Sequence, residues 1–280
     1  MRKRFTHKWK VATKVVLMLH QMKISLFQLD TLWKDKRANL ETIAHRIDEN
    51  QGSDIYVLPE MFATGFCNEV DELGETVYGQ IVDAMKSLAA KYHAAVCGSL
   101  ILHDGAKYYN SFLFVKPDGE ILRYDKRHLF RFGGEADMFS QGENRVIVEY
   151  KGYRILLQLC YDLRFPVWSR NRNDYDVIFY VANWPDSRRK VFDTLLKARA
   201  IENQSYVIGV NRVGDDGNGL HYDGGSCIID FKGEYVGRCP DNEEFVLTEK
   251  LDIEALRQFR EKFPAWSDAD EIMLKNTIGI

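Results

Sequence analysis

The sequence has no paired cysteine motif and no histidines grouped with cysteines. It has five cysteines, an odd number at scattered spacings, and none of them forms a CxxC pair: Cys67, Cys97, Cys160, Cys227 and Cys239. Disulfide frameworks and zinc sites are built from cysteines at regular spacings. The sequence therefore argues against both, predicts no metal and no other cofactor, and indicates a reducing compartment, for which we expect the cytoplasm.

An excess of charge of one sign, internal repeats and low-complexity tracts are also missing. The net charge of the 280 residues is −3, and basic and acidic residues are mixed along the chain. Proteins that bind nucleic acids usually carry a basic patch or stripe, so we expect no nucleic-acid partner. With 45% hydrophobic and 28% charged residues, the composition suits a globular protein with an ample core.

The N-terminal region has only a short apolar run, Val15–Leu19, behind several basic residues. This arrangement loosely resembles a signal peptide, but the run is short and no small-residue cleavage site follows it. The run is far too short to span a bilayer, and we expect no membrane partner. Because Met22 opens a clean strand pattern, we predict a mobile extension over Met1–Gln21, one domain over residues 22–270 and a tail over residues 271–280.

Strand and helix patterns alternate along this domain, with hairpins between them. Apolar spacing predicts strands over residues 23–29, 54–58, 94–102, 108–116, 120–124, 146–150, 154–159, 176–181, 205–211, 224–231 and 234–237. Helical spacing predicts helices that end near residue 51 and that cover residues 76–92, 188–203 and 253–261. No linker divides the chain, so we expect one α/β domain with mixed sheets covered by helices.

The stretch RILLQLCYDLRFP, residues 154–166, places a thiol at the end of a predicted strand. Ile155–Leu157 form an apolar run that is typical of a strand covered on both faces. Cys160 follows the run, and Pro166 suits the first turn of a helix. A thiol that faces a helix N-terminus is favoured as a thiolate, which predicts a nucleophile at Cys160. A lone cysteine beside an apolar run is, however, more often a small core residue.

Two charged residues stand near the ends of other predicted strands. Glu60, in YVLPEMF, would be partly desolvated by Tyr56 and Phe62, which would raise its pKa and suit it to act as a general base. It could equally be a loop glutamate or a helix cap. Lys126, in RYDKRHLF, could belong to a solvated basic patch. If it is instead held near Cys160, it would lower the pKa of the thiol and stabilise a developing oxyanion.

These three residues, in this order, resemble the Glu–Lys–Cys triad of the nitrilase superfamily of carbon–nitrogen hydrolases. Glu60 in LPEMF, Lys126 in YDKRHLF and Cys160 in LCYDLRFP match its three motifs. The similarity runs from Met22 to about Asp270. The resemblance implies a four-layer α-β-β-α sandwich, which is usually paired through helices into a homodimer.

The resemblance also implies a role for each matching residue. Cys160 would attack the amide carbon, and Glu60 would take the thiol proton and later activate water. Lys126 and the backbone N–H of Tyr161 would hold the tetrahedral oxyanion. Glu135, in FGGEADMF, matches a second glutamate of the family, which positions the substrate and the general base.

Longer stretches resemble the bacterial omega-amidase branch, namely HLFRFGGEADMFSQGE, FPVWSRNRNDYD and REKFPAWSDADE. NWP at Asn183 resembles the amidase branches, and the resemblance implies a substrate-binding role for Asn183. The omega-amidase branch hydrolyses the terminal amide of 2-oxo acid amides through a cysteine thioester. A 2-oxo acid amide carries a carboxylate, so a cation should face the site. Arg131, Arg164 and Arg188 are the candidates, although each could instead be a structural ion-pair partner.

Three alternatives remain open. The protein could be another amidase, a carbamoylase or a nitrilase of the same superfamily. It could be a non-catalytic binding or assembly protein, although a scaffold would not need the intact triad. It could also be a Cys–His hydrolase with His128 as the base, for which the sequence places no orienting Asn or Asp. For an amidase, the expected partners are a small amide substrate, water and a second copy of the chain.

Overall fold

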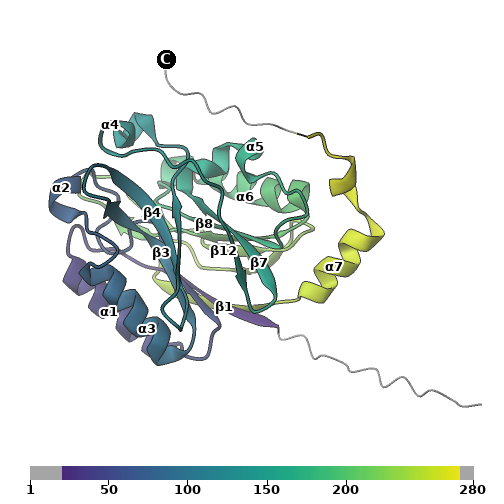
Figure 1. Cartoon of the computed structure of the whole chain (residues 1–280), viewed down its shortest axis with the longest axis horizontal. Coiled ribbons are helices and arrows are strands. Elements are labelled where there is room, and N and C mark those ends of the chain that lie inside the picture. The colour runs from purple at the N-terminus through teal and green to yellow at the C-terminus, as the bar shows by residue number, and fades with distance from the viewer. Residues whose placement is uncertain (1–20, 272–280) are drawn as a thin grey trace, which may run out of the picture.

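Apolar runs of the chain form two six-stranded sheets that pack face to face (Figure 1). In this computed structural model, which describes residues 21–271, the strand order is β14-β1-β2-β3-β4-β5 in the first sheet and β13-β12-β9-β8-β7-β6 in the second. The first sheet comprises β1 (Met22–Gln28), β2 (Ile55–Val57), β3 (Ala95–His103), β4 (Tyr108–Val115), β5 (Ile121–Asp125) and β14 (Phe245–Leu251). The second comprises β6 (Ile147–Tyr150), β7 (Tyr153–Leu159), β8 (Val177–Val181), β9 (Tyr206–Val210), β12 (Cys227–Ile229) and β13 (Tyr235–Arg238).

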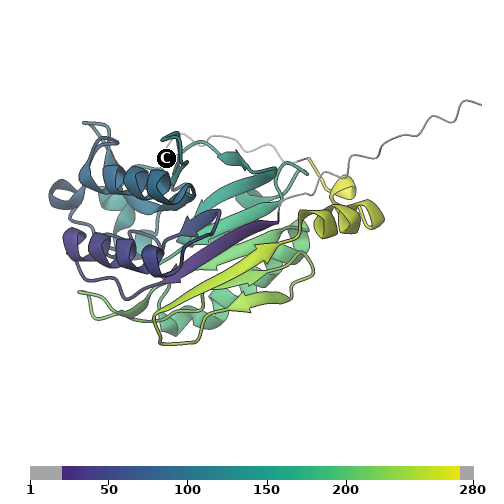
Figure 2. The same ribbon diagram turned by 90° about the horizontal axis from the view of Figure 1, so that it is seen from below.

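Helices cover the outer face of each sheet (Figure 2). The α-helices are α1 (Lys36–Glu49), α2 (Val70–Leu73), α3 (Gln80–Tyr92), α4 (Glu135–Met138), α5 (Pro166–Ser169), α6 (Arg189–Asn203) and α7 (Ile253–Lys262). Helices α1 and α3 lie side by side on the first sheet, and α6 packs on the second (Figures 1 and 2). The layers follow the order helix, sheet, sheet, helix, which confirms the predicted α-β-β-α sandwich.

An apolar core fills the space between the two sheets. Ile55 and Phe112 from the first sheet and Leu157 and Phe179 from the second are among its fully buried members. Burial of one such side chain contributes about 1.5–3 kcal/mol. Because β7 and β8 also carry α6 on their other face, every residue of β8 is buried. Coverage on both faces explains why these strands are continuous apolar runs rather than alternating patterns.

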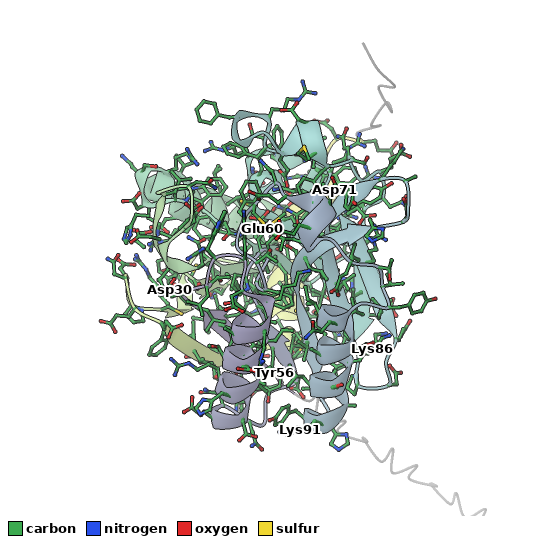
Figure 3. All side chains as sticks on the ribbon, turned by 90° about the vertical axis from the view of Figure 1, so that its left-hand side faces the viewer. Asp30, Tyr56, Glu60, Asp71, Lys86 and Lys91 are labelled. Carbon is green, nitrogen blue, oxygen red and sulfur yellow. The ribbon has the colours of Figure 1, made fainter. Side chains whose placement is uncertain are left out.

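Parallel pairing brings several strand ends to one region. Strands β1, β2 and β3 run parallel in the first sheet, and β7, β8 and β9 run parallel in the second. Glu60 follows β2, Cys160 follows β7 and Asn183 follows β8. Polar side chains at the carboxyl ends of parallel strands are a common basis for a site. Figure 3 shows Glu60 in the interior of the molecule, beyond the ends of α1 and α3.

The strand predictions were most accurate at the tight hairpins. Strands β6 and β7 join through Lys151 and Gly152, with φ of 48° and 82°, the left-handed conformation that a two-residue hairpin turn favours. The predicted helix over residues 76–92 begins later, at Gln80. The carboxylate of Glu75 accepts the N–H groups of Ile81 and Val82 and so satisfies the helix start from outside.

Three strands have no counterpart in the sequence prediction. Strand β14 pairs antiparallel with β1, and its residues are mostly exposed or half-buried, so it lacks a clear apolar run. A two-stranded hairpin, β10 (Val213–Asp215) and β11 (His221–Asp223), stands apart from both large sheets. The strand predicted over residues 224–231 is only Cys227–Ile229, because glycines with positive φ at 224 and 225 precede it.

Residues 1–20 and 272–280 lie outside the described part of the chain. The predicted extension Met1–Gln21, apart from Gln21, and nearly all of the predicted tail therefore remain predictions. Within residues 21–271, no helix is long and apolar enough to cross a membrane.

Candidate active site

Cys160 lies at the junction of β7 and a 3-10 helix, η2 (Cys160–Arg164), on a strained backbone. Its φ is +39°, a value that residues other than glycine rarely adopt and that often marks functional positions. The N–H groups of a first helical turn, including that of Tyr161, have no partner within the helix. The sharp turn thus places a thiol next to free N–H donors, which is the arrangement that an oxyanion hole requires.

Three charged side chains form a fully buried cluster beside Cys160. Glu60, Lys126 and Glu135 each have no solvent-exposed surface. The Lys126 Nζ donates to Glu60 Oε1 at 2.9 Å and lies 2.9–3.0 Å from both oxygens of Glu135. A buried charge is tolerated only where it is paired, and here one ammonium lies between two carboxylates.

Asn110, in the middle of β4, holds the two carboxylates at a set separation. Its Nδ2 donates to Glu60 Oε1 at 2.8 Å and to Glu135 Oε1 at 3.0 Å. The hydroxyl of Ser99 on β3 donates to Asn110 Oδ1 at 2.9 Å and so orients the amide. Sequence reasoning missed both residues. Their polar character inside apolar strands was the available signal, because a buried polar residue needs partners.

Asn183, proposed from the sequence as a substrate-binding residue, contacts Glu60. Its backbone N–H donates to Glu60 Oε2 at 2.8 Å, and its Nδ2 donates to the Glu60 carbonyl at 2.7 Å. The Asn183 carbonyl oxygen lies 3.8 Å from the Cys160 Sγ. Asn183 therefore links the base and the nucleophile across the two sheets, and it also lines the adjoining cavity.

Burial dominates the electrostatics of the thiol. Burial, and then Glu60, raise the pKa of Cys160 well above its usual value, and Lys126 offsets this rise only in part. Lys126 lowers the pKa of the thiol as predicted, but burial and Glu60 outweigh it, so the expected net preference for a thiolate is wrong for the resting site. Burial lowers the pKa of Lys126, but Glu135 and Glu60 outweigh it, so the pKa is raised and the ammonium persists. The thiol is protonated and needs a base when it attacks.

Asp162 connects the loop of the nucleophile to the loop of the lysine. Its carboxylate accepts the N–H of Leu159 at 3.0 Å, the N–H of His128 at 3.0 Å and the hydroxyl of Tyr124 at 2.6 Å. The His128 Nδ1 also lies 2.7 Å from this carboxylate. A fully buried carboxylate with donors from both loops holds them in register, a role that sequence reasoning missed.

The structure favours Glu60 over His128 as the catalytic base. The His128 ring stacks on Phe165 with the ring centroids 3.9 Å apart, and its Nδ1 is engaged by Asp162. Among the hydrogen bonds of residues 21–271, none joins His128 to Cys160, whereas Glu60 and Cys160 interact directly through their side chains. The histidine thus serves the architecture of the loops.

A cavity of about 350 Å³ opens onto the cluster. Lys126, Cys160 and Asn183 form its floor, and Phe66, Phe130, Phe132, Leu220 and Tyr222 contribute to its walls. A small polar set within mostly apolar walls is typical of a small-molecule site. The volume admits a ligand the size of a short carboxylic acid amide.

The three candidate arginines occupy different places. Arg188 lines the cavity, and its guanidinium lies 5.4 Å from the centre of the Phe130 ring. Arg164 lines a small adjoining cavity and stacks on Trp184 at 4.9 Å. Arg131 is exposed and lines neither cavity. Among the ion pairs of residues 21–271, none involves Arg188, so its charge is available to a ligand.

A larger cavity of about 680 Å³ lies between the β6–β7 hairpin and α7. Its central charges already pair with each other, because Arg154 and Arg260 both bind Asp176, at 2.8 and 3.1 Å. The walls of this cavity contain no thiol. The chemistry of the lining, rather than the volume, therefore identifies the smaller cavity as the candidate active site.

The site combines a protonated thiol with a buried carboxylate and a buried ammonium beneath a small cavity. This combination, at the strand ends of an α-β-β-α sandwich, is that of thiol hydrolases that cleave carbon–nitrogen bonds. The family model described as carbon–nitrogen hydrolase matches residues 23–261, and the chain belongs to this family. The resemblance inferred from the three motifs is confirmed.

Individual relatives agree with this assignment. The chain is 48% identical to omega-amidase YafV of Yersinia enterocolitica, over 90% of this chain and 98% of the relative. It is 31% identical to 2-oxoglutaramate amidase of Bacillus subtilis (strain 168), over 88% of this chain and 96% of the relative. The crystal structure of XC1258 from Xanthomonas campestris, a CN-hydrolase superfamily protein with an arsenic adduct in its active site, superposes with a TM-score of 0.89 at 43% identity, over 91% of this chain and all of that one.

Proposed function

We propose that the protein is an omega-amidase that hydrolyses the terminal amide of 2-oxo acid amides, such as 2-oxoglutaramate and 2-oxosuccinamate. The products would be a 2-oxo dicarboxylate and ammonia. The observation that carries the proposal is that the Cys160–Glu60–Lys126 cluster lies at the same cavity as the Arg188 guanidinium, which forms no ion pair within residues 21–271. The names of the relatives, omega-amidase and 2-oxoglutaramate amidase, support the same substrate class.

In the proposed mechanism, Glu60 takes the proton of Cys160 as the sulfur attacks the amide carbon. Lys126 and the N–H of Tyr161 stabilise the oxyanion of the tetrahedral intermediate. The intermediate collapses with cleavage of the C–N bond, and Glu60 returns the proton to the departing ammonia. Glu60 then activates a water molecule, which attacks the thioester, and the released thiolate regains a proton. Glu135 would position the Lys126 ammonium and the substrate throughout.

Arg188 would bind the carboxylate at the 2-oxo end of the substrate while the far amide reaches Cys160. The Phe66, Phe130 and Phe132 side chains would contact the intervening carbons. Arg188 fits this role better than Arg164, which lines only the small adjoining cavity, or Arg131, which is exposed. A guanidinium can bind a carboxylate through two parallel hydrogen bonds. An uncharged nitrile substrate has no carboxylate and so would not need this cation.

We further propose that the protein acts as a cytoplasmic homodimer paired through its outer helices. Val167 on α5 and Ile201 on α6 are 43% and 55% exposed, so these helices present apolar surface to the outside. All five cysteines are free, which supports a reducing compartment. Multi-angle light scattering on the wild type and on Ile201→Glu tests the dimer. A wild-type monomer would refute it.

Ammonia release from a small panel of substrates tests the activity. The panel comprises 2-oxoglutaramate, 2-oxosuccinamate, glutamine, asparagine, a carbamoyl amino acid and a nitrile. Glutamine carries an ammonium where the oxo acid has its ketone, and burial of an unpaired charge costs several kcal/mol. We therefore expect an oxo-acid amide to exceed glutamine by roughly a hundredfold or more in kcat/KM. A better rate with glutamine or the nitrile would refute the omega-amidase assignment.

A further inference from the structure

The β10–β11 hairpin brings a buried tyrosine and a buried aspartate to the cavity of Cys160. Tyr222 and Asp216 both line this cavity, and they are only 1% and 8% exposed. The Tyr222 hydroxyl donates to Asp216 Oδ2 at 2.8 Å. The mechanism proposed above uses neither residue. Buried polar groups are costly unless they are hydrogen-bonded, and a satisfied pair is held in one orientation.

The surroundings determine which way the hydroxyl points. Asp216 Oδ1 accepts the backbone N–H groups of Asn218 and Leu220, at 2.8 and 3.0 Å, and this leaves Oδ2 for the tyrosine. The Arg212 guanidinium lies 4.9 Å from the centre of the Tyr222 ring and packs against it. The single hydroxyl hydrogen therefore points at Asp216, and the oxygen offers only lone pairs to any other neighbour.

Tyr222 and the nucleophile Cys160 line the same cavity. Burial, and then the Asp216 carboxylate, raise the pKa of Tyr222, and the nearby Cys160 adds to this rise. The hydroxyl consequently keeps its hydrogen throughout the neutral pH range. Lys126 also lines this cavity and is a donor that suits the carbonyl oxygen of an amide. The cavity thus offers both a donor and an acceptor to a carboxamide.

We propose that Tyr222 is a specificity-determining residue that accepts an N–H of the scissile carboxamide, with Asp216 as the positioning residue that orients its hydroxyl. A carboxamide presents a carbonyl acceptor and an NH₂ donor, which match this arrangement. An ester presents a second oxygen in place of the NH₂ group, and its lone pairs would face those of Tyr222. A nitrile nitrogen likewise has no hydrogen to donate. The pair would therefore select amides over esters and nitriles at the reacting centre. The inference rests on the proposed amide hydrolysis but not on Arg188.

The ratio of kcat/KM for an amide to that for the methyl ester of the same acid tests the proposal. The pair 2-oxoglutaramate and the 5-methyl ester of 2-oxoglutarate differs only at the reacting centre. In Tyr222→Phe the acceptor is lost, so we expect the amide to lose roughly tenfold to a hundredfold and the ester to lose little. Tyr206→Phe removes a hydroxyl that bonds Asp252 at a site away from the cavity, and as the matched control it should leave the ratio unchanged.

Asp216→Asn separates orientation from packing. The two backbone N–H groups require an acceptor, so the new amide oxygen faces them and the NH₂ group faces Tyr222. The hydroxyl then accepts from this NH₂ group and its own hydrogen turns into the cavity. We expect the ratio to fall below that of Tyr222→Phe, because the ester now gains a donor.

The outcomes are decisive. An unchanged ratio in Tyr222→Phe, or equal losses for amide and ester, would overturn the proposal, even if Asp216→Asn proved unstable. If the wild type does not hydrolyse oxo-acid amides, the same ratio can be measured with whichever carboxamide of the panel is cleaved. Failure of the substrate assignment and failure of the Tyr222 assignment are therefore distinguishable.

Discussion

The floor and the rim of the cavity are built in different ways. The floor, with Lys126 and Cys160, is buried together with the Glu60 and Glu135 carboxylates beneath it. The charged groups there are paired, and most of them stand at the ends of strands. The rim comes from loops, the short helices η1 (Arg131–Gly133) and η3 (Asp186–Arg188) and the β10–β11 hairpin, and Phe132 on it is 89% exposed. Bond cleavage requires a preorganised site, whereas loops can change substrate choice without disturbing the sheets. Substitutions on the floor should accordingly impair turnover, and substitutions on the rim should alter selection.

Cys160→Ala should have the largest effect of all. Without the thiol, no thioester forms, and kcat should fall by at least about a thousandfold. The side chain contributes little to the core, so the melting temperature should change by only a few degrees. Ammonia release and differential scanning fluorimetry measure the two quantities. Substantial activity in this variant would refute the covalent mechanism.

Charge-conserving changes on the floor come next. Lys126→Arg forces a bulky planar group into a fully buried site between two carboxylates, and Glu60→Asp withdraws the base by one methylene. Each variant should lose about a hundredfold or more in kcat, because small misplacements are costly in proton transfer and oxyanion binding. A loss of only a few-fold would show that the residue is merely part of a structural ion-pair network.

Asp162→Asn should have an intermediate effect. An asparagine offers one acceptor oxygen where the carboxylate serves donors from the nucleophile loop and the lysine loop. We expect kcat to fall by about tenfold to a hundredfold with little change in KM. The nucleophile loop and the lysine loop would no longer be held in a fixed relative position, while the rim would be intact.

The matched control is Asp176→Asn. Asp176 is a buried carboxylate that binds Arg154 and Arg260, away from the cavity of Cys160. Both variants should lower the melting temperature by a few degrees. An unchanged kcat in Asp162→Asn, or equal losses in the two variants, would contradict the positioning role.

Arg188→Gln should have the smallest effect on activity, and it should act on KM rather than on kcat. Loss of the cation should raise KM for 2-oxoglutaramate by about tenfold or more, while kcat and the KM for an uncharged amide change little. Arg131→Gln removes an exposed cation that does not line the cavity and should leave both substrates unaffected. A selective rise in KM for Arg131→Gln instead would move the carboxylate site to the rim outside the cavity.

The sequence predictions were more accurate for the strands that lead to the floor than for the segments that form the rim. The elements that carry Glu60 and Cys160 were predicted because strands covered on both faces are uninterrupted apolar runs, and a polar residue at their end is conspicuous. Strand β14 and the β10–β11 hairpin were missed because they are short or half-exposed, and little in their own residues marks them. The resting thiolate at Cys160 was predicted wrongly, because the local pattern indicates a helix start but not the depth of burial.

By itself, the sequence determined the family, the layered fold and the identity of the three central side chains. Those properties depend on local periodicity and on residues within short motifs. Only the tertiary structure decided that Asn110 binds the buried carboxylates, that Asp162 binds both loops, and that Tyr222 and Arg188, but not Arg131, line the cavity. Their contacts join residues that lie far apart in the chain, and such distances arise only when two sheets and their loops pack together. The protonation of the thiol was decided there too, because desolvation is a property of the assembled interior.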